Sequence, residues 1–139
     1  MRWETSYGVI PLLRNEKGWK LFLIQHRRDR FWGFPKGHGE EGESPLETAE
    51  RELYEESGLH VLQLLREEPL LEEYTYQHQG IHIEKKVYFF LAITSEKFTL
   101  DIHEVVDGKW LSFQKAKELI SFREGQELVC HAERILKTL

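Results

Sequence analysis

The sequence predicts an α/β protein in which a mixed sheet packs against helices. Three features of the 139-residue chain support this prediction: a central helix with clear start and stop signals, strand-like segments on both sides of it, and a helical apolar stripe near the C-terminus. No repeat or linker-like tract interrupts the chain. We therefore expect one domain over residues 1–139.

Two strands are expected before the central helix, over residues 5–13 and 19–26, with the turn-like residues 15–18 between them. Further strands are expected after the helix, near residues 61–68, 70–76, 81–94 and 104–111. Two helices are expected to close the chain, and Ser112 is a suitable N-cap for the first of them. The second carries its apolar residues at helical spacing: Leu128, Val129, Ala132, Ile135 and Leu136.

The central helix is expected to run from Pro45 to Ser57. Ser44 is a favourable N-cap, and Glu47 is placed three residues later to close a capping box. Pro45 suits the first helical position, and Gly58 can adopt the left-handed conformation that ends a helix.

Three glutamates of this helix, Glu52, Glu55 and Glu56, gather on an arc roughly 100° wide beside its apolar stripe. Two of them lie in the last turn, where the helix dipole disfavours an anion by about 0.3–1 kcal/mol. A solvated acidic face explains Glu47 and Glu50 on the outer side, but a bound divalent cation better explains carboxylates at the core edge. Carboxylate oxygens favour Mg²⁺, with Mn²⁺ as a possible substitute.

The segment from Gly37 to Leu59 resembles the Nudix motif: Gly, five residues, Glu, seven residues, then Arg-Glu-U-x-Glu-Glu-x-Gly-U, where U is aliphatic. The matching residues are Gly37, Glu43, Arg51, Glu52, Leu53, Glu55, Glu56, Gly58 and Leu59. This resemblance implies an α/β/α sandwich with a central mixed sheet. It also implies hydrolysis of a nucleoside diphosphate linked to another group, with Mg²⁺ held on a loop-helix-loop.

The same resemblance assigns metal ligands. These are Glu52, Glu55 and Glu56, with the carbonyl of Gly37 completing the shell. Arg51 is expected to orient the acidic side chains, because it can pair with Glu55 at i+4 and reach Glu43 across the loop.

A carboxylate near the metal is expected to act as the general base. A glutamate of the motif is the first candidate. Glu104, which lies outside the motif, is a second candidate and also a candidate metal ligand. The alternative is that Glu104 is an exposed acid at a strand edge or in a loop.

The flanks of the motif resemble the asymmetrical dinucleoside tetraphosphatases, and the lead-in also resembles diphosphoinositol polyphosphate phosphohydrolases. The resemblance rests on residues 32–38, 85–92, 103–104, 110–111 and 124–130. It implies that Lys36 and His38 contact phosphate. The alternative is a basic loop that only aids solubility.

A nucleobase requires a flat apolar surface, and Tyr76 is the preferred candidate because it precedes a polar loop. The alternative platforms are Tyr74, Tyr88 and Phe122, any of which could instead pack within the core. Lys85 or Lys86 is expected to contact a distal phosphate, since only alternate strand residues share a face.

A formal net charge of −5 argues against broad binding to nucleic acid or anionic lipid. The only cysteine, Cys130, excludes an intramolecular disulfide, and no apolar run has the length of a membrane span. These features favour a cytoplasmic protein whose partner is a small-molecule nucleotide. The sequence leaves the oligomeric state open, with a monomer as the working expectation.

The leading hypothesis is Mg²⁺-dependent hydrolysis of dinucleoside polyphosphates, with diadenosine tetraphosphate giving ATP and AMP as the favoured case. One alternative keeps the chemistry and changes the substrate to a diphosphoinositol polyphosphate, a nucleoside triphosphate, ADP-ribose or an RNA 5′ end. Another alternative is a nucleotide-binding sensor module without catalysis.

Overall fold

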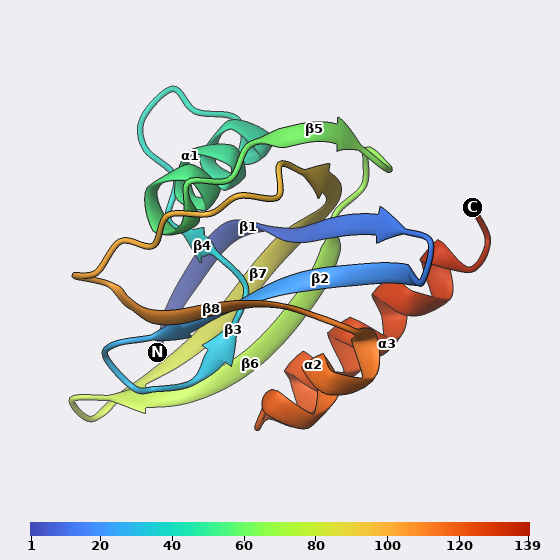
Figure 1. Ribbon diagram of the computed structural model, residues 1–139. Helices are drawn as coiled ribbons and strands as arrows, with labels where there is room; N and C mark the ends of the chain where they lie inside the picture. Colours follow the sequence, from blue (N-terminus) through green and yellow to red (C-terminus); the bar gives the residue numbers. More distant parts are fainter.

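A mixed sheet with helices on both faces forms the computed structural model, which describes residues 1–139 (Figure 1). Its strands are β1 (Arg2–Asn15), β2 (Gly18–His26), β3 (Trp32–Gly33), β4 (Lys36–Gly37), β5 (Val61–Leu64), β6 (Leu70–His78), β7 (Ile81–Thr94) and β8 (Val105–Leu111). Its helices are α1 (Pro45–Ser57), α2 (Phe113–Leu119) and α3 (Arg123–Leu136). None of the three helices combines the length and apolarity that crossing a membrane requires.

The central strands follow the order β3-β2-β1-β7-β5, while β4 pairs with β1, β6 with β7 and β8 with β2. Strands β1 and β7 are parallel, with Arg2 opposite Ile83 and Leu12 opposite Ile93. The other pairs are antiparallel. The predicted mixed sheet is therefore confirmed.

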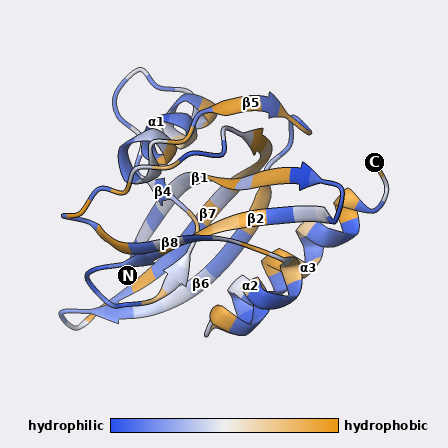
Figure 2. Cartoon of the chain, viewed as in Figure 1, coloured by the Kyte–Doolittle hydropathy of each residue, from blue (hydrophilic) through white to orange (hydrophobic).

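Two apolar cores lie on opposite faces of the sheet. Because successive strand residues point to opposite faces, Ile10 packs in the core beneath α2 and α3 whereas Val9 packs in the core beneath α1. Figure 2 shows the apolar residues concentrated in the middle of β1 and β2, with hydrophilic residues on the outer sides of α1 and α3. This arrangement is the predicted α/β/α sandwich.

The ends of α1 agree with the sequence prediction. The Ser44 side chain accepts a hydrogen bond from the Glu47 N–H at 3.2 Å, and Glu47 accepts one from the Ser44 N–H at 2.9 Å. Gly58 has a φ of 71° and donates its N–H to the carbonyl of Tyr54. These local contacts fix the helix that carries the motif glutamates.

Several strand boundaries differ from the prediction. The strand expected over residues 61–68 ends at Leu64, because three charged residues and Pro69 follow shortly after. Strand β8 begins at Val105, so Glu104 lies in the preceding loop. Strands β3 and β4 have two residues each, which is too short for a periodic pattern to reveal.

Candidate active site

Arg51 holds the loop before α1 against the helix. Its Nε donates to Glu43 Oε2 at 2.7 Å, and its Nη1 lies 3.0 Å from Glu52 Oε1 and 3.2 Å from Glu55 Oε1. Its Nη2 donates to the His38 carbonyl at 2.9 Å. The Arg51 guanidinium lowers the pKa of Glu43 to about 2. Arg51 thus has the contacts that an orienting residue needs.

Glu43 belongs to the scaffold of the site. Besides Arg51, it accepts hydrogen bonds from the Glu40 N–H at 2.9 Å and the Thr48 hydroxyl at 2.8 Å. These bonds leave its carboxylate committed to the loop. Glu43 therefore ties the loop to the helix that carries the motif glutamates.

Glu56 is the most deeply buried of the motif glutamates, with 8% of its surface exposed. Its carboxylate accepts a hydrogen bond from the Lys36 N–H at 3.2 Å. Burial raises the pKa of Glu56 to about 8, and the negative charges of Glu52 and Glu104 act in the same direction. Burial also raises the pKa of Glu52, although Arg51 opposes that rise.

Gly37 has no side chain where the Glu52 carboxylate lies. A Cβ built on Gly37 would overlap that carboxylate, so any other residue would force the two apart. The close approach brings the Gly37 backbone beside Glu52, which suits the carbonyl ligand that the motif implies.

The donor set fits a hard divalent cation. Glu52 and Glu56 carry raised pKa values because burial leaves their negative charges poorly compensated, and a cation would stabilise both ionised forms. No three His, Cys, Asp or Glu side chains are already gathered as a metal cage. Arg51 instead pairs with Glu52 and with the exposed Glu55.

Glu104 is exposed, and its charge acts on Glu56 of α1. Its carbonyl accepts the Arg27 N–H at 2.9 Å, and the guanidinium of Arg27 donates to the Ile102 carbonyl at 2.9 Å. The Asp101 N–H donates to the Glu56 carbonyl at 3.2 Å. The loop that carries Glu104 is thereby attached to both β2 and α1.

A second polar group lies on the face of the sheet covered by α3. Lys85 is 6% exposed, its Nζ donates to Ser6 Oγ at 2.6 Å, and Glu4 Oε1 lies 3.9 Å away. The hydroxyl of Tyr76 donates to the same Glu4 oxygen at 2.7 Å. Burial lowers the pKa of Lys85 to about 8, and the positive charge of Lys36 lowers it further.

The strand register separates the two candidate lysines. Tyr74 lies opposite Lys85 in the antiparallel β6–β7 pair, so alternation places Lys85 on the face of Tyr74 and Tyr76. Lys86 points to the other face, where Tyr88 stacks on Tyr7 with ring centroids 5.8 Å apart. Lys86 therefore does not share the face of Tyr76, and neither does Tyr88.

Lys36 interacts both with the motif glutamates and with the group formed by Lys85, Glu4 and Tyr76. Its backbone N–H binds Glu56, while its side-chain charge acts on Lys85 and on Glu72 of β6. The His38 side chain is exposed beside β1, with Nδ1 3.2 Å from the Thr5 carbonyl. The hydrogen bond from Tyr76 lowers the pKa of Glu4, and His38 acts weakly in the same direction.

Sequence reasoning missed Glu72 and the contact between Phe31 and Phe122. Glu72 occupies the same face of β6, a relation that counting alternate residues back from Tyr76 could have found. Phe31 and Phe122 form an exposed edge-to-face pair with centroids 4.7 Å apart. No local pattern brings those two distant aromatics together.

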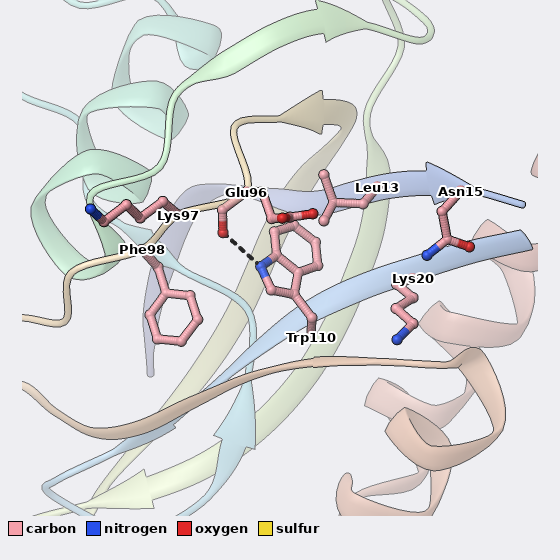
Figure 3. Close-up of a pocket in the computed structure, with 7 residues that line it drawn as sticks. All are labelled: Leu13, Asn15, Lys20, Glu96, Lys97, Phe98 and Trp110. Carbon is pink, nitrogen blue, oxygen red and sulfur yellow. Dashed lines mark hydrogen bonds between the residues drawn. The ribbon is translucent and has the colours of Figure 1, made fainter. Parts of the chain in front are cut away.

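A shallow hollow elsewhere in the molecule is separate from these residues. It has a volume of about 460 Å³ and lies among β1, β2, β8 and the loop that contains Phe98 (Figure 3). Its Trp110 donates the indole N–H to the Glu96 carbonyl at 2.9 Å. None of the residues predicted for catalysis or binding lines this hollow.

Comparison with known proteins identifies the family. The model of the NUDIX domain matches residues 4–130. The chain belongs to the Nudix family. A mouse (Mus musculus) protein named asymmetrical bis(5′-nucleosyl)-tetraphosphatase is 34% identical to this Nudix chain over 132 residues, covering 88% of each chain. An RNA pyrophosphohydrolase of Bartonella bacilliformis is 50% identical over 71 residues, which span 47% of this chain and 42% of that relative.

Solved structures support the Nudix fold. A binary complex of the C. elegans Ap4A hydrolase has a TM-score of 0.73 and 20% identity, with 97% of this chain and 98% of that one covered. The predicted Nudix fold and pyrophosphohydrolase class are confirmed. Nudix hydrolases act on small nucleotide substrates and generally use divalent metal ions such as Mg²⁺.

Proposed function

We propose that this Nudix protein hydrolyses dinucleoside polyphosphates with Mg²⁺, and that diadenosine tetraphosphate, cleaved to ATP and AMP, is the favoured substrate. The observation that carries the proposal is that Lys85 and Tyr76 share one face of the sheet, where the positive charge of Lys36 acts on Lys85. Lys36 is in turn bonded to Glu56 of the motif. A polyphosphate that starts at the motif glutamates would meet two lysines and then an aromatic ring.

The motif glutamates supply the metal ligands in this proposal. Those ligands are Glu52, Glu55 and Glu56, with the carbonyl of Gly37. A bound Mg²⁺ supplies charge neutralisation at the phosphate oxygens and a more acidic water. Arg51 keeps Glu52 and Glu55 pointed toward the loop through its 3.0 and 3.2 Å contacts.

Two kinds of carboxylate are candidates to receive the proton of the attacking water in this proposal. A glutamate of α1 is the first, since Glu52 and Glu56 both favour protonation more than an exposed carboxylate does. Glu104 is the second, because it is exposed and close enough for its charge to act on Glu56. Substituting each by glutamine and comparing the pH dependence of kcat distinguishes them.

The lysines bind the phosphate chain in this proposal. Lys85 is held by Ser6 and Glu4, so its ammonium group has a fixed position. His38 is exposed beside β1 and offers a further contact in this proposal. A nucleobase that stacks on Tyr76 gains about 1–3 kcal/mol, and the hydrogen bond to Glu4 fixes the ring that it would meet.

The mouse tetraphosphatase supports this substrate because the similarity covers 88% of both chains. Hydrolysis of a triphosphorylated RNA 5′ end is the second candidate function, favoured by the 50% identity to the Bartonella enzyme over 71 residues. A net charge of −5 weighs against an extended contact with RNA. We include a cytoplasmic location, a single domain and monomeric action in the proposal.

Product analysis by ion-exchange chromatography tests the proposal. The protein is incubated with MgCl₂ and, separately, diadenosine tetraphosphate, ATP, ADP-ribose, a diphosphoinositol polyphosphate and a 5′-triphosphorylated oligoribonucleotide. We expect equal amounts of ATP and AMP from the first substrate, and no reaction in EDTA. Rapid turnover of the oligoribonucleotide with none of diadenosine tetraphosphate would refute the substrate assignment. Tight nucleotide binding without turnover, unchanged by Glu56→Gln, would indicate a sensor.

A further inference from the structure

Glu72 and Tyr74 carry polar groups that the protein leaves without partners. Glu72 is half-buried on β6, and no hydrogen bond contributes to its pKa. The hydroxyl of Tyr74 likewise has no hydrogen-bonded partner, and burial raises its pKa above the ordinary value, so the hydroxyl stays protonated. Every fully buried side-chain nitrogen or oxygen has a hydrogen-bond partner. Because these two groups have none, they are not fully buried and retain access to solvent or a ligand.

The first turn of α3 passes close to the Glu72 carboxylate. Gly125 has no side chain there, and a Cβ built on it would lie 3.7 Å from Glu72 Oε2. Lys36 supplies the positive charge that acts on Glu72, while Glu124 opposes it. Burial is the larger influence and raises the pKa of Glu72.

These groups form a row with the proposed base platform. Glu72, Tyr74 and Tyr76 share one face of β6, so neighbouring members are roughly 6–7 Å apart along the strand. Lys85 lies opposite Tyr74 in the sheet. A nucleotide whose phosphates contact Lys85 and whose base lies over β6 would therefore bring the edge of that base to Glu72 and Tyr74.

The hydrogen-bonding chemistry of Glu72 and Tyr74 favours a particular edge of a nucleobase. An ionised carboxylate only accepts hydrogen bonds, whereas a phenol can donate one. Adenine offers both complements side by side, because its 6-amino group donates and its N1 accepts. A phosphate at this position would meet the negative charge of Glu72, so this part of the face suits a base better than a further phosphate.

We propose that Glu72 determines base specificity by accepting a hydrogen bond from the 6-amino group of adenine, while the Tyr74 hydroxyl donates to N1. This inference rests on the proposed function, because it places the base on the face that carries Tyr76. It adds a specificity residue that contacts the base and takes no part in cleaving the phosphate chain.

Nucleotides of purine riboside test the assignment because they lack only the 6-amino group of adenine. We expect wild-type protein to prefer diadenosine tetraphosphate over its purine riboside analogue by about tenfold or more, mainly through KM. Glu72→Met, which removes the acceptor, should bring the preference close to unity, and Glu72→Gln should give an intermediate ratio. Glu73→Gln is the matched control, because Glu73 is exposed on the opposite face and should leave the ratio unchanged.

Calorimetric binding of ATP and purine riboside triphosphate, in MgCl₂, is measured on the same four proteins. If wild type does not cleave diadenosine tetraphosphate, the proposed function fails, and the ratio of the two Kd values still tests Glu72. A wild-type ratio near unity, or no binding of either nucleotide, would overturn the inference. The inference would also be overturned if the ratio of the two Kd values persisted in Glu72→Met. An equal loss of affinity for both nucleotides in a folded Glu72→Gln protein would overturn it as well.

Discussion

Replacing Glu56 with glutamine should stabilise the protein in the absence of metal. The carboxylate is 8% exposed, and its pKa is about 8 in the folded chain against a reference of 4.5. The folded state therefore binds a proton that the unfolded state has already released, and stability falls as the pH rises from 4.5 to 8. At pH 7 this costs at most about 3 kcal/mol, because each pH unit above the unfolded pKa contributes about 1.4 kcal/mol.

The assay is urea unfolding in EDTA between pH 4.5 and 8. We expect Glu56→Gln and wild type to have similar stability at pH 4.5, and a difference approaching about 3 kcal/mol in favour of the variant at pH 7. The glutamine oxygen can still accept the Lys36 N–H. Glu50→Gln on the exposed side of α1 is the control and should change stability by less than about 0.5 kcal/mol.

Saturating Mg²⁺ should cancel most of the difference between the two proteins at pH 7. A ligand at 100 times its Kd stabilises the folded state by about 2.7 kcal/mol, and only wild type retains the charged ligand. Activity of Glu56→Gln should fall by at least about 100-fold. A wild-type protein whose stability in EDTA does not change from pH 4.5 to 8, or a variant less stable than wild type at pH 8, would refute the reasoning.

Three further variants test the scaffold and the substrate face. Arg51→Ala should lower the unfolding temperature by roughly 5 °C, because it removes the partner of Glu43. In wild type, the ionised Glu43 contributes stability above pH 4.5 that is lost as the pH falls through about 2, and the variant should lack this contribution. Calorimetry from pH 2 to 5 measures both effects. Gly37→Ala should displace the Glu52 carboxylate and raise the Mg²⁺ concentration for half-maximal activity by about tenfold or more, as metal titration would show. Lys85→Met should raise KM for diadenosine tetraphosphate about tenfold with little loss of stability, whereas an unchanged KM would remove Lys85 from the site.

The parts of the fold that the sequence predicted are those with local determinants. Helix α1 begins and ends as expected because Ser44, Glu47 and Gly58 each make contacts with residues three or four positions away. The contacts of Arg51 with Glu43 and Glu55 were predicted for the same reason, since a helical turn and a short loop fix their separation.

The residues that share the face of Lys85 and Tyr76 could not be predicted from any local pattern in the sequence. Choosing between Lys85 and Lys86 requires the register of β6 on β7, and a shift of one residue would reverse the answer. Glu72 resembles any surface glutamate in the sequence, because its burial comes from α3, more than fifty positions away in the chain. The pair of Phe31 with Phe122 has the same origin in tertiary packing.

The negative net charge and an anionic substrate are compatible because the charges are divided between two regions that Lys36 joins. The three motif glutamates lie on α1, where a divalent cation would offset them, while Lys85 faces the α3 side of the sheet. Strand β4 lies between these regions: its backbone N–H binds Glu56, and its lysine side chain acts on Lys85 and Glu72. A substrate that bridges both regions must therefore carry several phosphates in sequence and a base beyond them. The dinucleoside polyphosphate that we propose as the substrate has both of these parts.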